Sequence, residues 1–364
     1  MSQPDVQPTA SMTGDRGGAR VVTILGAGAM GSALATPFRT AGWSVRLWGT
    51  WLDDHLLAAC RAGRPHPRTN VPLAAGTELF DHRELAGALD GAELVVIAVA
   101  SVGVEEVVRR AAPGLAGARA ILLTSKGFAP DEQGRIELLP AAARRVAAGQ
   151  GVQLPPIIAV GGPCKANEVA AGRATAAVFA AEDTGLAKDV ARSVATDSYR
   201  AQALGDENGV EVCAPMKNVY AIALGITDGL ADRGGQPWHD LKAAAFARAV
   251  QEMIELSTLV GGQADTAFGL AGVGDLEVTA LSGRNSVYGS RIGRGQTAAE
   301  ALEAMTAAEQ TVEGVPAAEL AATLVDQRAP GLWPSLPLLA AVRDIIRGDT
   351  DPHGRLVAAA LPTV

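Results

Sequence analysis

The chain has 364 residues, of which 48% are hydrophobic and 19% are charged, and its formal net charge at pH 7 is -8. This composition predicts a folded protein that is long enough for two domains with substantial cores. The acidic balance gives no general footprint for nucleic acid or for an anionic membrane surface, so we expect neither a nucleic-acid partner nor membrane insertion.

The first residues and the cysteines predict a cytoplasmic protein. Residues 1–20 are polar and contain no apolar signal segment, which predicts a disordered tail. Cys60, Cys164 and Cys213 lie far apart, as is typical of reduced thiols rather than of a disulfide frame or a zinc site. The five histidines show no H-E-x-x-H spacing, so no metal is expected. The longest uncharged apolar run, residues 94–104, is shorter than the ~20 residues that span a bilayer.

A glycine-rich stretch at residues 21–35, VVTILGAGAMGSALA, dominates the first half of the chain. A short aliphatic run predicts a buried strand, and Gly26, Gly28 and Gly31 follow it as G-x-G-x-x-G before a helical pattern. An ordinary glycine-rich turn is the alternative, but a strand before the motif and a helix after it are typical of dinucleotide binding at a helix N-terminus. The predicted cofactor contacts in this turn are Gly26, Gly28, Ala29, Met30 and Gly31.

The end of the next predicted strand, residues 43–48, bears on the choice of cofactor. In this class of fold an acidic residue there binds the ribose 2′-hydroxyl of NAD, and its absence leaves room for the phosphate of NADP. Here the strand is followed by Gly49 and Thr50, and the first acid is Asp53. The cofactor is therefore NAD or NADP, and the pattern favours NADPH.

Apolar runs at residues 92–100, 120–123 and 157–160 predict three further buried strands. Open parallel sheets bind ligands at the carboxyl ends of their strands, and Ser101 and Lys126 fall at such ends. Residues 101–110 are expected to begin a helix. The other strands predicted in this half of the chain are residues 176–180 and one at Tyr199.

Beyond residue 204 the pattern becomes helical. Apolar residues recur at helical spacing around Pro215, which is expected to kink or start that helix. Asp240 is the expected N-cap of a helix that ends at Leu259. The remaining expectations are a glycine-rich bend at residues 268–275, a polar turn-rich segment at 284–294 and a helix at 298–308.

These observations predict an α/β fold in which a Rossmann-type doubly wound sheet is followed by an all-helical C-terminal domain. The dinucleotide-binding domain would cover residues 21–203 and the helical substrate domain residues 204–364. The reacting centre would lie in the cleft between them.

Four residues of the helical half carry groups suited to ketone reduction. Lys217 interrupts an apolar helix face, where burial would lower its pKa toward the range of a proton donor, unless its amine extends to solvent. Asp275 follows a glycine-rich bend and is either a supporting carboxylate or a turn residue. Arg284 and Asn285 suit an anionic phosphate or carboxylate, the alternative being a surface loop.

The motifs GAGAMG, SKG, GGPCKANEVAAG, APMKNVYAIALGITDGL, GLAGVGDLEVT, GRN and QTVEGV occur in this order. In order and spacing they resemble the NAD(P)-dependent glycerol-3-phosphate dehydrogenases over nearly the whole chain after residue 20. The resemblance implies NAD(P)H-dependent reduction of dihydroxyacetone phosphate to sn-glycerol 3-phosphate, a precursor of glycerophospholipids.

The resemblance also implies roles for individual residues. Lys217 would be the catalytic acid and base, Lys126 a second active-site lysine and Asp275 a supporting carboxylate. The remaining implied residues are Asn218, Arg284 and Asn285 on the substrate, the latter two at its phosphate, and Glu313 near the cofactor.

The chain departs from the family pattern at two places. The segment after the strand at 92–99 reads Ala100, Ser101, Val102 where the family usually has a proline. The loop that is commonly Gly-Pro-Ser-Phe-Ala contains Cys164 and Lys165 here, and the extra cation could contact phosphate or change the preferred ketone.

Two alternatives to this function stay open. A reductase of a related phosphorylated ketone or a 2-keto acid shares the architecture and also uses a lysine. A non-catalytic NAD(P) sensor would bind the cofactor without turnover, although it has no need of a lysine on an apolar helix face. A homodimer is expected from the apolar helical half.

Overall fold

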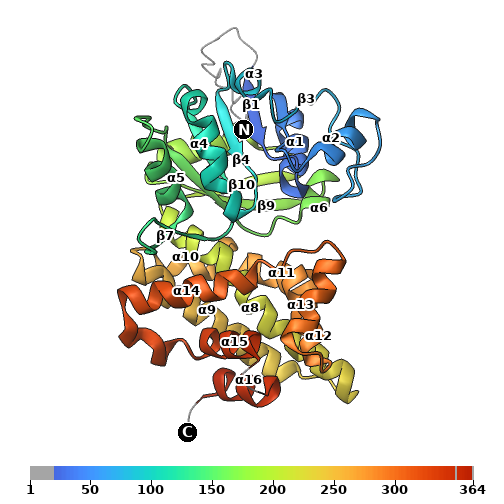
Figure 1. Ribbon diagram of the computed structural model, residues 1–364, viewed down its shortest axis with the longest axis vertical. Helices are drawn as coiled ribbons and strands as arrows, with labels where there is room; N and C mark the ends of the chain where they lie inside the picture. The colour runs from blue at the N-terminus through green and yellow to red at the C-terminus, as the bar shows by residue number, and fades with distance from the viewer. Residues whose placement is uncertain (1–19, 349–350, 363–364) are drawn as a thin grey trace, which may run out of the picture.

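The computed structural model describes residues 20–348 and 351–362, so the predicted tail lies outside the described residues apart from Arg20. A sheet part built from the first half of the chain is stacked on a helical part built from the second half (Figure 1). The last strand ends at Leu204 and the first long helix of the second part begins at Glu207.

The first part is organised around an eight-stranded sheet in the order β10-β9-β8-β5-β4-β1-β2-β3. The six strands from β8 to β3 are parallel, β9 is antiparallel to β8, and β10 is parallel to β9. The chain order reverses between β1 and β4, which is the point where such sheets bind ligands, and the predicted Rossmann-type fold is confirmed. The strands are β1 (Val21–Leu25), β2 (Ser44–Trp48), β3 (Glu78–Phe80), β4 (Leu94–Ile97), β5 (Ala120–Leu123), β8 (Ile157–Gly161), β9 (Thr175–Ala180) and β10 (Tyr199–Leu204).

Helices cover both faces of this sheet, so its central strands are buried on both sides. On β1, Val22 and Ile24 pack toward α1, α6 and α7, whereas Leu25 packs toward α4 and α5. This doubly wound arrangement explains why the central strands read as continuous apolar runs. The helices of this part are α1 (Ala29–Thr40), α2 (Asp54–Arg61), α3 (Leu85–Leu89), the 3₁₀ turn η1 (Ser101–Gly103), α4 (Val104–Leu115), α5 (Leu139–Ala148), α6 (Ala166–Ala170) and α7 (Thr184–Val194).

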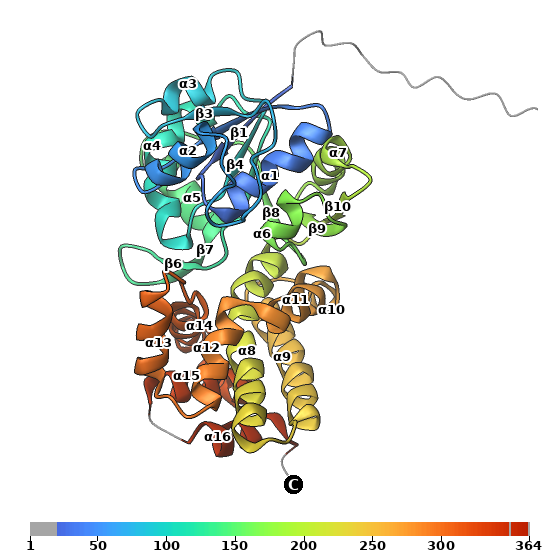
Figure 2. The same cartoon turned by 90° about the vertical axis from the view of Figure 1, so that its right-hand side faces the viewer.

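The second part is built around α8, whose residues are buried on all sides over most of its length. Figure 2 shows α8 running lengthwise through this part from the sheet toward the far end, with the other helices around it. A helix that is apolar all round belongs in a core. The helices are α8 (Glu207–Gly234), α9 (His239–Leu259), α10 (Ala264–Phe268), the π turn η2 (Leu270–Gly274), α11 (Asp275–Ser282), α12 (Arg284–Gly293), α13 (Ala298–Ala307), α14 (Gly314–Arg328), the 3₁₀ turn η3 (Pro330–Ser335), α15 (Pro337–Arg347) and α16 (Pro352–Ala360).

The prediction of a turn-rich segment at residues 284–294 was wrong, because Arg284–Gly293 form the helix α12. Its glycines serve packing rather than turning. A side chain on Gly289 would collide with the backbone of Ile222 in α8, and one on Gly225 of α8 would collide with Ser286. Glycines on both helices therefore allow the two backbones to approach closely.

Smaller differences from the predicted elements lie at local boundaries. The expected bend at 268–275 is the π turn η2 followed directly by α11. Asp240 is not the N-cap of α9, since Trp238 holds that position, but it lies in the first turn, where its charge suits the helix dipole. Pro215 lies inside α8, which runs on across it.

A short antiparallel hairpin, β6 (Phe128–Pro130) with β7 (Ile136–Leu138), was not predicted. Phe128 and Ile136 pack into the core of the helical part, so the hairpin joins the two parts. No helix in residues 20–348 and 351–362 is long and apolar enough to span a bilayer.

Candidate active site

The glycine-rich turn forms an open cradle at the start of α1. The first backbone N–H groups of a helix have no partner within the helix itself. In α1 no side chain caps them and the first turn contains no acidic residue, so they are available to an anion. A side chain on Gly31 would collide with the backbone of Gly26, and one on Gly26 with Ala98, whereas Gly28 borders open space with only Arg68 nearby. These features fit the pyrophosphate of a dinucleotide, and the individual cofactor contacts stay predictions.

Lys126 is held at the carboxyl ends of the central strands. It follows β5 through Thr124 and Ser125, and both hydroxyls anchor this loop to the neighbouring strand end. Thr124 Oγ1 donates to Ile97 O at 3.1 Å, and Ser125 Oγ donates to Val99 O at 2.7 Å. The lysine stem therefore starts from a rigid position at the ligand-binding edge of the sheet.

One carboxylate brings the two predicted lysines together. Asp275, the first residue of α11, has a side chain that is 1% exposed. Lys126 Nζ donates to its Oδ2 at 2.9 Å, and Lys217 Nζ of α8 donates to its Oδ1. The Lys217 side chain is 8% exposed, so its amine does not extend into solvent. An amine from the sheet part and an amine from the helical part thus share one acid.

The surroundings separate the pKa values of the two lysines. Burial lowers the pKa of Lys217 to about 8, since the attraction of Asp275 only partly offsets the loss of water and the positive charge of Lys126. Burial also acts on Lys126, but the charge and hydrogen bond of Asp275 outweigh it and raise its pKa above the ordinary range. Near neutral pH Lys126 is therefore a fixed cation, whereas Lys217 can exchange its proton.

The residues predicted for substrate binding lie beside one another. Asn218 Nδ2 donates to Glu313 Oε2 at 3.4 Å, and an Arg284 Nη2 lies 3.8 Å from Glu313 Oε1. Asn285 Oδ1 accepts from Gly314 N at 2.8 Å, which leaves its Nδ2 to bind a ligand. Glu313 contacts residues of the helical part, and its proximity to the cofactor stays a prediction.

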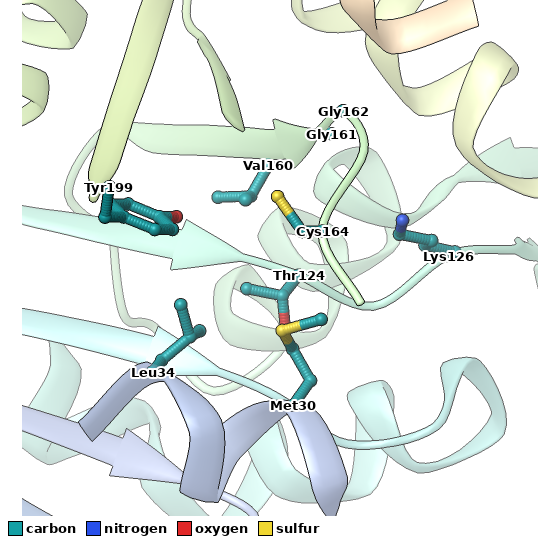
Figure 3. Close-up of a pocket in the computed structure, with 9 residues that line it drawn as sticks. All are labelled: Met30, Leu34, Thr124, Lys126, Val160, Gly161, Gly162, Cys164 and Tyr199. Carbon is teal, nitrogen blue, oxygen red and sulfur yellow. The ribbon is translucent and has the colours of Figure 1, made fainter. Parts of the chain in front are cut away.

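A cavity of about 20 Å³ lies between the start of α1 and the ends of β5 and β8. Figure 3 shows Met30 and Thr124 close together on one side of it, with the Cys164 thiol and the Lys126 amine above them. Burial raises the pKa of Cys164 to about 12, so its thiol stays protonated. The cysteine that replaces the usual serine is therefore not a nucleophile near neutral pH.

Lys165, the other departure in this loop, bridges the two parts of the molecule. Its Nζ donates to Ser282 Oγ at the end of α11 at 2.6 Å. Ser282 lies two residues before Arg284 in the chain, so the extra cation contacts the segment that leads into α12.

Two residues fix the glycine-rich turn in a way that the sequence did not predict. Asp53 Oδ2 accepts from Ala27 N at 3.2 Å, and His66 Nε2 lies 2.9 Å from Ala27 O. Both side chains are buried. Residues 61–72 around His66 are rich in Pro and Arg, a composition that indicates a loop but does not reveal where the loop packs.

A dinucleotide cradle on a Rossmann-type sheet, with a buried lysine pair at the strand ends, defines the class as a nicotinamide-nucleotide-dependent oxidoreductase. The N-terminal family model of the NAD-dependent glycerol-3-phosphate dehydrogenases matches residues 21–187, and the C-terminal one matches residues 206–356. The chain belongs to this family.

Relatives and a solved structure agree with this assignment. An NADP(+)-dependent glycerol-3-phosphate dehydrogenase of Archaeoglobus fulgidus is 37% identical over 78% of this chain and 83% of its own length. A glycerol-3-phosphate dehydrogenase [NAD(P)+] of Chelativorans sp. is 32% identical over 93% of this chain and 95% of its own. The crystal structure of glycerol-3-phosphate dehydrogenase from Coxiella burnetii superimposes with a TM-score of 0.80, at 29% identity, over 93% of this chain and 98% of that one.

Proposed function

We propose that the protein reduces dihydroxyacetone phosphate to sn-glycerol 3-phosphate with NADH or NADPH, reversibly, and so supplies glycerophospholipid synthesis. The observation that carries this proposal is the Lys126–Asp275–Lys217 cluster at the strand ends of a chain of this family. A cofactor sensor would have no use for two amines that a buried acid holds at the same point.

Lys217 is the proton donor in the proposed mechanism. The nicotinamide cofactor, when bound, supplies the hydride to C2 of the ketone. As the carbonyl π electrons move to oxygen, Lys217 Nζ gives that oxygen its proton, and its pKa of about 8 lets it recover one from solvent. Lys126, which stays charged, stabilises the negative charge developing on the same oxygen. Asp275 holds both amines in place.

The substrate phosphate would be bound by Arg284, Asn285 and Asn218. Arg284 is half exposed, with its guanidinium on one side of Glu313, so it is accessible to an anion. The bond from Gly314 N to Asn285 Oδ1 fixes the orientation of the amide, and the Nδ2 of Asn285 is then available to donate to the phosphate. Binding energy from this remote group would hold C2 in position for the reaction.

Three further assignments belong to this proposal. The dinucleotide-binding domain covers residues 21–203 and the helical domain residues 204–364, which the change from strands to helices after Leu204 supports. A cytoplasmic location is supported by the free thiols of Cys60, Cys164 and Cys213. A homodimer is proposed as well, and sedimentation of the purified protein tests it.

A comparison of initial rates tests the proposed substrate. We expect oxidation of NADPH or NADH with dihydroxyacetone phosphate and a much larger KM for dihydroxyacetone, which lacks the phosphate. Ketopantoate should not support turnover. Rapid oxidation with ketopantoate and none with dihydroxyacetone phosphate would identify the protein as a 2-keto acid reductase, and cofactor binding without any turnover would identify a sensor.

A further inference from the structure

We propose that Arg68 binds the 2′-phosphate of NADP and makes NADPH the preferred cofactor. The inference rests on the proposed use of a nicotinamide dinucleotide and specifies which one. It depends on three observations: an acid that is occupied elsewhere, a loop that is anchored to the glycine-rich turn, and a guanidinium beside Gly28.

The acid nearest to the end of β2 already accepts three hydrogen bonds through one of its oxygens. Asp53 Oδ2 accepts from Thr50 N at 2.9 Å, from Thr50 Oγ1 at 2.8 Å and from Ala27 N at 3.2 Å. Its residue is 7% exposed. Asp53 therefore fastens the end of β2 to the glycine-rich turn, and it is not the carboxylate that would bind a ribose 2′-hydroxyl and repel a phosphate.

The loop that carries Arg68 is fastened to the same turn. His66, which is 1% exposed, has its Nε2 2.9 Å from Ala27 O, and its Nδ1 accepts from Arg68 N at 3.2 Å. The two bonds together require the neutral ring with its proton on Nε2. Burial lowers the pKa of His66, which favours that neutral form. Asn70 N also donates to His66 O at 2.8 Å, closing the loop.

This loop directs a free cation at the cofactor cradle. Arg68 Nη1 is the nearest atom to a Cβ built on Gly28, at 3.9 Å, so the guanidinium lies at the edge of the cradle. No carboxylate in residues 20–348 and 351–362 forms a salt bridge with it. Asp53, which holds Thr50 just after β2, and His66 of this loop both bond to the backbone of Ala27 in the glycine-rich turn. We therefore place Arg68 at the ribose end of the cofactor, which binds beside the end of the second strand in this class of fold. A planar guanidinium suits a phosphate dianion there.

Direct binding of the two cofactors tests the proposal without depending on the substrate. Titration of the full-length protein should give a lower Kd for NADPH than for NADH. In Arg68→Ala the Kd for NADPH should rise about 10- to 100-fold, the loss expected for charge-assisted hydrogen bonds. The Kd for NADH should stay unchanged. Arg64→Ala, which removes another exposed arginine of the same loop, is the matched control and should alter neither Kd.

Three outcomes would overturn the assignment. If Arg68→Ala weakens NADH and NADPH equally, Arg68 contacts the shared pyrophosphate instead. If neither Kd changes, it contacts neither, and if the unmodified protein binds NADH more tightly, the cofactor preference is reversed. Failure to reduce dihydroxyacetone phosphate with the expected binding changes intact would overturn the proposed substrate and leave Arg68 in its role.

Discussion

Asp275 is a single carboxylate between two amines, and this imbalance of charge explains the chemistry that we assign to the site. With both lysines protonated the cluster carries an excess positive charge in a buried place, so one of them loses its proton more readily. Lys217 is the more buried of the two side chains, at 8% against 16% exposure. The group with the lowered pKa is thus the one we expect to exchange a proton.

The pH dependence of the reaction follows from the state of Lys217. Ketone reduction needs the protonated amine, so kcat/KM for dihydroxyacetone phosphate should be level below a pH of about 8 and fall above it. Oxidation of sn-glycerol 3-phosphate needs the neutral amine and should rise over the same interval. Initial rates in both directions, measured across this pH range, check the prediction, and profiles that move in the same direction would contradict it.

Removing the charge of Asp275 should move this profile. The carboxylate raises the pKa of Lys217, so Asp275→Asn should lower that pKa further and move the falling limb of ketone reduction to lower pH, with a reduced kcat. Asp240→Asn, on the exposed side of α9, is a control for which we expect no shift. A lower kcat with an unmoved profile would mean that Asp275 has only a structural role.

Arg284 should affect the binding of substrate rather than turnover. Arg284→Ala removes the proposed charge-assisted bonds to the phosphate, so KM for dihydroxyacetone phosphate should rise about 10- to 100-fold. KM for dihydroxyacetone should not change. Arg294→Ala, which removes an arginine paired with Asp232 at the other end of α12, is the control. An equal effect on both substrates would refute the phosphate contact.

At the scale of elements, the contact between α8 and α12 positions the site. Lys217 and Asn218 lie on α8, and Arg284 and Asn285 begin α12. Because glycines line the crossing of the two helices, the proposed proton donor and the proposed phosphate ligands are brought close together. The spacing between these two functions is thus set by backbone contact and not by flexible side chains.

Adding one methyl group to this contact should destabilise the protein. In Gly289→Ala the new Cβ would collide with the backbone of Ile222, and we expect the free energy of unfolding to fall by about 1–3 kcal/mol. In Gly234→Ala, near the end of α8, the Cβ meets nothing within 4 Å, so helix propensity should leave stability unchanged or slightly higher. Urea unfolding of both variants measures the difference, and equal stability would contradict the close contact.

The sequence predicted the elements whose signal is local. The apolar runs of β1, β5 and β8 and the glycine-rich turn carry their own pattern, and the structure confirms them. Residues 284–294 were misread because glycine and polar residues suggest turns, and only the approach of α8 explains them. The hairpin of β6 and β7 was missed because its strands are three residues each, too short for a periodic pattern.

In the candidate site as well, the sequence predicted individual residues but not how they come together. Lys126, Lys217 and Asp275 were each singled out from the sequence, but their meeting at one point depends on tertiary packing that no local pattern contains. The contacts of Asp53 and His66 with the backbone of Ala27 were not predicted, because a residue of any type in a loop can hold a backbone group and no local pattern marks it.

At the scale of the whole molecule, the proposed catalytic groups come from both parts. Lys126 belongs to the sheet part, whereas Lys217 and Asp275 belong to the helical part. The β6–β7 hairpin fixes the two parts, since Gln327 of α14 accepts from Ile136 N at 2.9 Å and donates to Gly134 O at 2.7 Å. The cluster of Lys126, Asp275 and Lys217, to which we assign the proposed catalysis, therefore exists only while the sheet and the helices are correctly joined.

Replacement of Lys217 tests the central claim most directly. Lys217→Met keeps an unbranched side chain in the core of the junction but removes the proton donor, and Lys188→Met, at an exposed position of α7, is the matched control. We predict that kcat with dihydroxyacetone phosphate falls about 10²- to 10⁴-fold in Lys217→Met only, while the Kd for the cofactor is unchanged in both. A Lys217→Met protein that turns over at nearly the unmodified rate would contradict the account.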